Sequence, residues 1–419
     1  MSSKAKTTTQ KPDGKPTLTP KLRFPEFQNA GEWDEGCIAD IGTVLQGYGF
    51  PEKHQGLKNG EYPFYKVSDI SKSLAAGKVF IEEAVNYINE SLLKEMRAKP
   101  IPEGTTVFAK IGEAIRSNKR AITTIPCLID NNAAGVKRIE GKATDFFIYL
   151  VMEQISLIEH AGGVVPAVNK SAIEAIPVKF PTIAEQQKIA ECLSSVDEVI
   201  AAQARKVDAL KIHKKWLMQQ LFPREGEAQP RLRFPEFQRD GDWQQRTLGD
   251  ACTMQAGKFV AAAEIKEQNA GGMFPCYGGN GLRGFTATHT HDGVFPLIGR
   301  QGALCGNVKL ATGRFHATEH AVVATPNRGI EVMWLYYLLD LLNLNRFATG
   351  QAQPGLSVDV LEKVSATIPK DKREQHRIAS CLSSLDALIA AETQKLEALK
   401  RHKRGLMQQL FPSPEEATL

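Results

Sequence analysis

The chain has 419 residues, of which 42% are hydrophobic and 24% are charged. This composition supports buried cores and excludes a disordered or fibrous protein, and the length predicts about two to three domains. The net charge of +5 at pH 7 permits binding to nucleic acid without requiring it. No apolar run reaches the roughly 20 residues of a membrane span, so we expect no membrane partner and a cytoplasmic protein.

The chain is predicted to begin with a disordered tail, residues 1–20, which is rich in Lys, Thr and Pro. A globular region over residues 21–181 follows, and it opens with the sequence LRFPEFQ at 22–28. Short β-type runs broken by Gly and Pro, followed by an apolar helix, predict a mixed α+β domain. The predicted elements are strands within 105–111 and 121–129, a helix near 146–158 and a turn at 162–166.

A long helix is predicted over residues 182–223. Thr182 and Glu185 have the spacing of a capping box, and Pro223 provides the stop. Apolar residues recur at alternating spacings of four and three, which predicts a coiled-coil seam. The apolar seam residues are Ile189, Leu193, Val196, Ile200, Val207, Leu210, Leu217 and Leu221, with Gln203 and Lys214 at the two remaining positions.

The second half of the chain repeats this plan. LRFPEFQ returns unchanged at 232–238, inside a region of linker and globular domain over 224–370. Here the predicted elements are strands within 293–299 and 321–325, a helix near 332–344 and a turn at 350–354. A second long helix is predicted over 371–412, with Asp371 and Glu374 as its capping box, and a short tail over 413–419 ends the chain.

The two long helices are closely related in sequence. Residues 185–223 and 374–412 are identical at 25 of 39 positions. The second seam consists of Ile378, Leu382, Leu385, Ile389, Leu396, Leu399, Leu406 and Leu410, with Glu392 and Lys403 at the remaining positions.

The two seams are each other's expected partners, and two separate helices that each pack on their own domain are the alternative. A parallel pair would place Lys214 against Lys403, whereas an antiparallel pair places Lys214 near Leu385, where its stem can pack. We therefore predict an α+β fold: two mixed α/β domains separated by two long helices that form an antiparallel coiled coil, with a pseudo-two-fold internal repeat.

Motifs for catalysis or metal binding are not evident. Glycines 279, 281 and 284 fit G-x-G-x-x-G, but no helical pattern follows them, so a Gly-rich turn is the better interpretation. A phosphate-binding G-x-x-x-x-G-K-[ST] is absent, and so is any Pro-Pro dipeptide of an amino-methyltransferase. We predict no catalytic residue, although a nuclease site dispersed over the sequence stays open.

The histidines and cysteines also favour a structural interpretation. His289, His291, His316 and His320 lie near Cys276 and Cys305, but their spacings match no familiar metal site, so we predict no metal. Seven cysteines without a C-x-x-C pair indicate free thiols, and Cys192 and Cys381 are expected to be packing residues beside the seam.

Basic and amide side chains gather in the turn-rich parts of both globular regions. These are the groups that hydrogen-bond to base edges and phosphates, although a solvated surface explains any single cluster equally well. The candidate DNA-binding residues are Lys110, Arg116, Asn118, Lys119 and Arg120 in the first region, and Arg283, Arg300, Gln301, Asn307, Lys309 and Arg314 in the second.

LRFPEF is followed by a Gly and a Trp, and a later EQ-x-x-IA opens a long helix that ends in LMQQLFP, twice over. This order of motifs resembles the specificity subunits of type I restriction-modification systems. Internal motifs resemble the target recognition domains of the family. They are FPCYGGNG (274–281), LIGRQGALCG (297–306) and ATEHAVV (317–323), with counterparts YPFYKVSDI (62–70), VFAKIGEAI (107–115) and DNNAAGVK (130–137).

The resemblance implies two target recognition domains, each reading one half of a split site in double-stranded DNA. It also implies two modification subunits that carry S-adenosylmethionine, and restriction subunits that carry ATP and Mg, with no cofactor on this chain. A stand-alone DNA-modifying enzyme and a coiled-coil adaptor without DNA binding are the alternatives.

Overall fold

The computed structural model describes residues 18–75, 77–302, 304–350 and 354–412. The chain divides into two compact units, Met1–Lys206 with Thr393–Leu419, and Val207–Glu392. The division cuts both long helices, so each unit combines one globular region with the N-terminal half of one long helix and the C-terminal half of the other. We call residues 21–181 head 1 and residues 224–370 head 2. Most of the predicted N-terminal tail (1–17) and the predicted C-terminal tail (413–419) lie outside the described residues.

Head 1 is built on a five-stranded sheet of order β2-β9-β6-β7-β4, next to a three-stranded sheet β5-β3-β8 and a two-stranded ribbon β1-β10. The strands are β1 (Asp34–Cys37), β2 (Gly42–Gln46), β3 (Tyr62–Tyr65), β4 (Phe80–Ile81), β5 (Asn86–Ile88), β6 (Thr106–Ala109), β7 (Arg120–Thr123), β8 (Leu128–Ile129), β9 (Ala133–Arg138) and β10 (Pro177–Phe180). The helices are α1 (Ile38–Ile41), α2 (Val67–Ala75), α3 (Glu90–Glu95), α4 (Asp145–Gln154) and α5 (Lys170–Glu174).

The apolar helix α4 forms the core of head 1. Its sequence is hydrophobic on nearly every side, and residues 147–152 are all buried. A helix of this kind must be covered all round. It packs against β6, β7 and β9 of the sheet, whose own residues are buried on both faces over most of their length.

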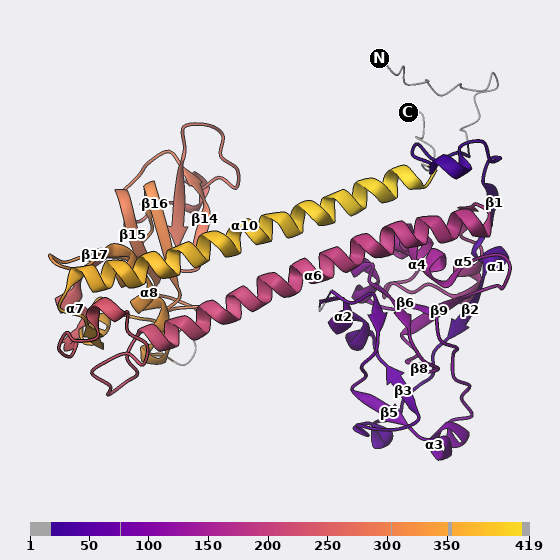
Figure 1. Ribbon diagram of the computed structural model, residues 1–419, viewed down its shortest axis with the longest axis horizontal. Coiled ribbons are helices and arrows are strands. Elements are labelled where there is room, and N and C mark those ends of the chain that lie inside the picture. Colours follow the sequence, from indigo (N-terminus) through magenta and orange to yellow (C-terminus); the bar gives the residue numbers. More distant parts are fainter. Residues whose placement is uncertain (1–17, 76, 303, 351–353, 413–419) are drawn as a thin grey trace. The chain divides into compact units, whose positions relative to one another are not determined.

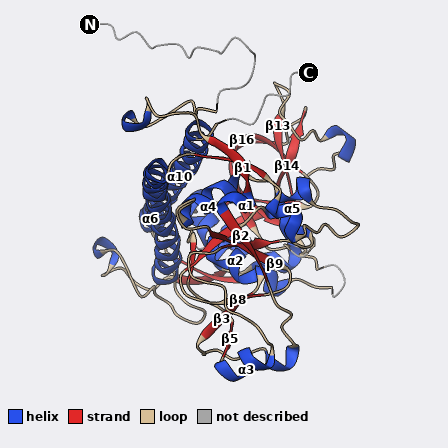
Figure 2. Ribbon diagram, turned by 90° about the vertical axis from the view of Figure 1, so that its right-hand side faces the viewer, coloured by secondary structure: helices blue, strands red, loops and turns tan. Residues whose placement is uncertain are grey.

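Head 2 has a six-stranded sheet of order β12-β17-β15-β16-β13-β14 and a ribbon β11-β18. The strands are β11 (Gln244–Thr247), β12 (Cys252–Ala256), β13 (Phe274–Gly278), β14 (Gly281–Thr286), β15 (His291–Gly299), β16 (Val308–Ala317), β17 (Ala321–Pro326) and β18 (Ser365–Ile368). The helices are α7 (Leu248–Ala251), α8 (Val332–Leu341) and α9 (Val358–Glu362). Helix α8 packs on β15, β16 and β17, as α4 does on its sheet. Figure 2 distinguishes strands, in red, from helices, in blue.

The long helices are α6 (Ile183–Leu221) and α10 (Lys372–Leu410), each of 39 residues (Figure 1). In unit 1, Ile189 and Leu193 of α6 share a core with Leu410 of α10. In unit 2, Leu221 of α6 shares a core with Ile378 and Leu382 of α10. In both units the start of one helix meets the end of the other, which is antiparallel pairing. The predicted fold class is confirmed, and the alternative of two unpaired helices is wrong.

Every predicted seam position of both helices is buried or half-buried. The lysines at the polar seam positions have the surroundings expected for antiparallel pairing. Lys214 forms an ion pair of 2.6 Å with Asp386, beside Leu385, and its ammonium lies 5.1 Å from the ring centre of Tyr337. In unit 1 Lys403 contacts Asp197 at 2.9 Å and Glu153 at 3.2 Å. Each lysine therefore has a carboxylate partner on the opposite helix.

The predicted capping boxes are wrong in one respect. Asp371 does cap α10, because its carboxylate accepts a hydrogen bond of 2.8 Å from the backbone N–H of Arg373. Glu185 and Glu374, however, are buried and bind other partners. Glu185 accepts two hydrogen bonds from the guanidinium of Arg23, at 2.7 and 2.6 Å, and one from the indole N–H of Trp33.

The same arrangement recurs in unit 2 and explains the repeated LRFPEF-G-W sequence. Glu374 accepts hydrogen bonds from Arg233, at 2.7 and 2.8 Å, and from the indole of Trp243 at 3.2 Å. The backbone N–H of Leu232 donates to Gln220 near the end of α6, and in unit 1 that of Leu22 donates to Gln409 near the end of α10. Each motif therefore fastens a head to the start of one long helix and the end of the other.

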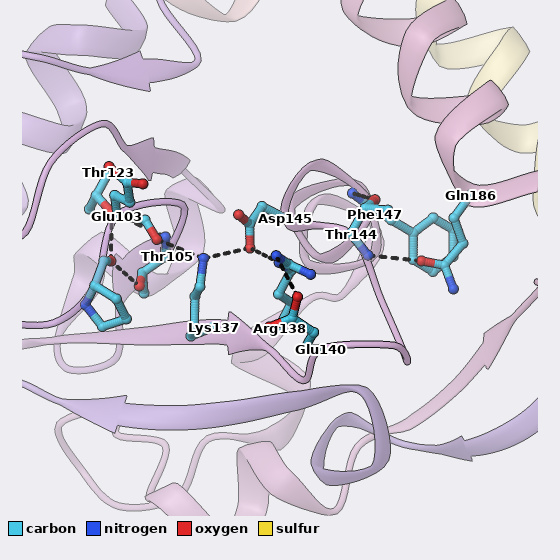
Figure 3. Close-up of polar contacts among 11 residues, drawn as sticks. Glu103, Thr105, Thr123, Lys137, Arg138, Glu140, Thr144, Asp145, Phe147 and Gln186 are labelled. Carbon is cyan, nitrogen blue, oxygen red and sulfur yellow. Dashed lines mark hydrogen bonds and ion pairs between the residues drawn. The ribbon is translucent and has the colours of Figure 1, made fainter. Parts of the chain in front are cut away.

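The glutamine that follows each of these glutamates fastens the head's own helix. The side chain of Gln186 accepts a hydrogen bond from the backbone N–H of Thr144, directly before α4, and donates to the carbonyl groups of Lys142 and Pro181. Figure 3 shows this contact, together with the ion pairs of Asp145 with Lys137 and Arg138 at the start of α4. Gln375 binds Glu331, Gly329 and Pro369 in the same way in unit 2.

Candidate nucleic-acid interface

In head 1, three loops meet at the residue that follows strand β6. This residue, Lys110, donates its backbone N–H to the carbonyl of Asn132 at 2.8 Å and accepts a hydrogen bond from Val168 at 2.9 Å. Two residues later, Gly112 donates to Pro166 at 2.8 Å. These bonds hold the segments after β6, before β9 and before α5 in one place, which we call the head 1 junction.

Head 2 has the same junction, built from different side chains. Arg300, which follows β15, donates its N–H to the carbonyl of His320 at 3.0 Å and accepts from Leu356 at 2.9 Å. Gly302 donates to Pro354 at 3.0 Å. Lys110 and Arg300 therefore occupy equivalent backbone positions in the two heads, as the paired sequence motifs indicate.

A long cationic side chain stands at the centre of each junction. The ammonium of Lys110 contacts the side-chain oxygen of Gln46, and partial burial lowers the pKa of Lys110. The Nε of Arg300 is buried and has no hydrogen-bond partner within the described residues. Since an unsatisfied buried donor costs free energy, an external acceptor that reached the Nε of Arg300 would be favoured.

Arg120 contradicts the expectation that it faces DNA. Its side chain is only 2% exposed, and its guanidinium donates to the backbone carbonyls of Met152, Lys119 and Ile155 inside head 1. Burial lowers the pKa of Arg120 to about 10. Asn118 is also used internally, because its side chain accepts from Arg120 and donates to the carbonyl of Glu153. The structure assigns both residues to the support of head 1.

The other candidates are exposed. Arg116 pairs with Glu113 at 2.9 Å and Arg314 with Asp292 at 3.1 Å, but exposed pairs of this kind are weak and exchange readily for other anions. The remaining exposed side chains are Lys119, Arg283, Gln301, Asn307 and Lys309. Gln301 follows Arg300 directly, and its backbone pairs with Gly355 at the head 2 junction.

The glycine and histidine motifs of head 2 have structural roles. Gly279, Gly281 and Gly284 belong to the hairpin between β13 and β14, where a Cβ on Gly284 would lie 2.5 Å from the carbonyl of Lys266. His316 is buried and its ring contacts Thr288 and the carbonyl of Lys258. No group of three metal-binding side chains occurs within the residues that the structure describes.

No helix in the described part of the chain is long and apolar enough to cross a membrane.

Burial raises the pKa of the thiols of Cys127 and Cys252 to about 12, which keeps them protonated and unreactive. Cys192 and Cys381 are half-buried beside the seam. The cations Lys110 and Arg300 make the two junctions the candidate functional surfaces.

Residues 30–211 and 240–401 match the family model of the type I restriction modification DNA specificity domain. The chain belongs to this family. The resemblance drawn from the sequence motifs is thereby confirmed, and the two matched ranges correspond to the two halves of the internal repeat.

Individual specificity subunits are similar to the chain over different lengths. It is 42% identical over 164 residues to the specificity subunit of the type I restriction enzyme EcoprrI from Escherichia coli, covering 39% of this chain and 40% of that protein. It is 22% identical to the MjaVIII specificity subunit from Methanocaldococcus jannaschii over 93% of both chains. A crystal structure of a type I S subunit from M. genitalium shares the fold, with a TM-score of 0.62 and 18% identity over 95% of this chain and 100% of that one.

The sequence identified the cations of the junctions but missed what surrounds them. The turn at 162–166 is visible in the sequence as a Gly-to-Pro segment, yet nothing local indicates that it lies against Lys110. That proximity depends on backbone hydrogen bonds between residues more than 50 positions apart, such as that between Lys110 and Val168.

Proposed function

We propose that the chain is the DNA sequence-specificity subunit of a type I restriction-modification complex and reads a bipartite target in double-stranded DNA. One observation carries this proposal: the same backbone junction presents Lys110 in head 1 and Arg300 in head 2, within dissimilar surroundings. The two heads share a backbone arrangement but present different side chains. Such a pair is suited to recognising two different DNA sequences in the same binding geometry. Lys and Arg are also the residues that most often contact guanine in the major groove.

The domain division follows from this function. Residues 21–181 and 224–370 act as the two target recognition domains, and the helices over 182–223 and 371–412 act as the scaffold between them. Lys119, Arg116 and Arg314 are suited to phosphate contacts, because exposed cations release counterions on binding. Arg300, Gln301, Asn307, Lys309 and Arg283 form the proposed contact surface of head 2.

The chain is proposed to be non-catalytic and to work in the cytoplasm with two modification subunits, which bind S-adenosylmethionine, and with restriction subunits, which use ATP and Mg. Methylome sequencing of a host that carries this chain and its modification subunits tests the proposal. Methylated adenines in a split site, lost when this chain is deleted, are the expected result. Methylation that persists without it, or methyl transfer by the isolated chain, would contradict the proposal.

The faces of the long helices support a partner that binds twice. The seam is covered by the opposite helix. On one flank Met218 packs in the core of head 2, and Asp197 forms an ion pair with Lys403 of the opposite helix. Two exposed faces differ in how far the two copies have diverged. On the outermost face the exposed pairs are Glu198 and Ala387, Arg205 and Gln394, Ile212 and Arg401, and Gln219 and Gln408.

The exposed stripe on the other flank of the seam has hardly diverged. Its pairs are Ser195 and Ser384, Val199 and Leu388, Ala202 and Ala391, Ala209 and Ala398, and His213 and His402. Within the described chain, no contact explains why these residues are small and identical in both copies. A partner that covers the stripe in both copies does explain it. Small side chains also permit the close approach of another helix. We infer that one modification subunit docks on the stripe of each long helix.

Charge insertion tests this docking surface. Ala202→Glu with Ala391→Glu places a carboxylate in each stripe without weakening the helix, since Glu is a good helix former. We expect the double variant to lose both modification subunits and each single variant to lose one, as measured by the mass of the assembled complex. Arg205→Glu with Gln394→Glu, on the outermost face, is the matched control. Full assembly of the stripe variants would contradict the docking surface.

A further inference from the structure

Head 1 displays an unusual apolar turn. Val164 is 105% exposed and Val165 is 63% exposed, and Val164 is the most exposed large hydrophobic side chain in the described part of the chain. Single exposed apolar residues are common on protein surfaces and require no explanation. Two consecutive β-branched residues at the tip of one turn are less common, because a soluble protein gains nothing by keeping them in water.

The turn is held in place. Gly162 and Ala167 exchange two backbone hydrogen bonds of 3.1 Å, which close a loop of four residues, and Gly163 takes the positive φ of 89° that this loop needs. Ala167 also pairs with Ile111, and Pro166 accepts the hydrogen bond from Gly112. The backbone that carries the two valines is therefore fixed by hydrogen bonds, so little conformational entropy is lost when their side chains bind a partner.

The turn lies at the head 1 junction. A surface groove beside it is lined by Lys110, Ile111, Glu159, His160 and Asn169. One fixed cation, one carboxylate, one amide and one imidazole thus stand next to the apolar tip. Hydrogen-bonding side chains beside an apolar group match a DNA groove, where base edges offer donors, acceptors and the methyl group of thymine. Val164 and Val165 supply the apolar part that Lys110 and Asn169 lack.

We propose that the Val164–Val165 turn enters a groove of the DNA and reads the first half-site through apolar contacts with the bases. This inference rests on the proposed function of the chain and adds two specificity-determining residues to it. DNA-binding proteins use apolar side chains in this way, against thymine methyl groups or between base steps. An apolar contact neutralises no phosphate. Its loss therefore leaves the salt dependence of DNA binding unchanged, unlike the loss of a lysine or arginine contact.

The test uses the full chain assembled with its modification subunits. Val164→Ser with Val165→Ser removes the apolar tip without adding charge. We expect about a tenfold loss of affinity for DNA that carries the complete site, which is the usual scale for one lost base contact. Binding selection should show relaxed preference within the first half-site and an unchanged second half-site. The slope of log affinity against log salt should stay the same, because valine releases no counterions.

A control keeps the result interpretable. Val85→Ser changes another exposed valine of head 1, 52% exposed, and is expected to alter neither half-site. Unchanged discrimination in the double variant, equal losses in both half-sites, or a smaller salt slope would overturn the inference. A wild-type complex that selects no split site would instead overturn the proposed function, so the two failures are distinguishable.

Discussion

Phe411, the last residue but one of the second long-helix segment, belongs to the core of head 1. Its side chain is 5% exposed, and its ring centre lies 5.7 Å from that of Phe147 and 5.6 Å from that of Trp33. Phe222 has the same place in the first long-helix segment, yet it packs in head 2, 5.9 Å from Trp334. The end of each repeat therefore completes the head of the other repeat.

Phe411→Ala consequently should destabilise the N-terminal head. Removing a buried Phe typically costs about 3 to 5 kcal/mol, because a cavity is left between the remaining rings. A domain is usually stable by about 5 to 15 kcal/mol, so a large share of the stability of unit 1 is lost. Phe222→Ala should cost a similar amount in unit 2, where Phe222 is 1% exposed.

Hydrogen exchange read by mass spectrometry distinguishes the two heads. Phe411→Ala should speed exchange in strands β6, β7 and β9 and leave β15, β16 and β17 protected, whereas Phe222→Ala should do the reverse. Binding to the first half-site should weaken only in the former variant. Faster exchange in head 2 on mutation of Phe411 would refute the crossed assignment of the helix ends.

A fragment of residues 21–223 should form a two-fold dimer in sedimentation experiments, since Leu221 and Phe222 of a second copy replace Leu410 and Phe411; a stable monomer would be inconsistent with this. Arg23→Ala should cost about 3 to 5 kcal/mol in thermal unfolding, because the buried carboxylate of Glu185 loses its cationic partner, and a change below 1 kcal/mol would show that the pair is dispensable. Arg300→Ala should relax only the second half-site and Lys119→Ala should weaken only binding at the first, with a salt slope reduced by about one for Lys119; losses shared by both half-sites would count against separate heads.

The long helices were predictable because their signal is local and repeated. The four-three spacing fixed the seam, and the conflict between Lys214 and Lys403 was sufficient to choose the antiparallel orientation. That choice is supported by the ion pair of Lys214 with Asp386. The sequence along one helix and its copy was sufficient for both predictions.

The predictions that depended on distant partners were wrong or incomplete. Glu185 has the spacing of a capping residue, but its carboxylate instead binds Arg23, which is far away in the sequence. Arg120 is a residue type that often contacts DNA, but its guanidinium is buried and donates hydrogen bonds to carbonyl groups at the end of α4. Strand β16 escaped prediction because its outer residues are polar and Gly313 interrupts it, whereas its pairing with β15 decides its conformation.

Binding selection from random duplex DNA, with the chain assembled with its modification subunits, tests whether each head reads one half of a split site. We expect two short specific parts separated by a spacer of fixed length and arbitrary sequence. We also expect variants of head 1 to alter one part and variants of head 2 the other. One contiguous motif, or a single part sensitive to variants of both heads, would contradict this expectation.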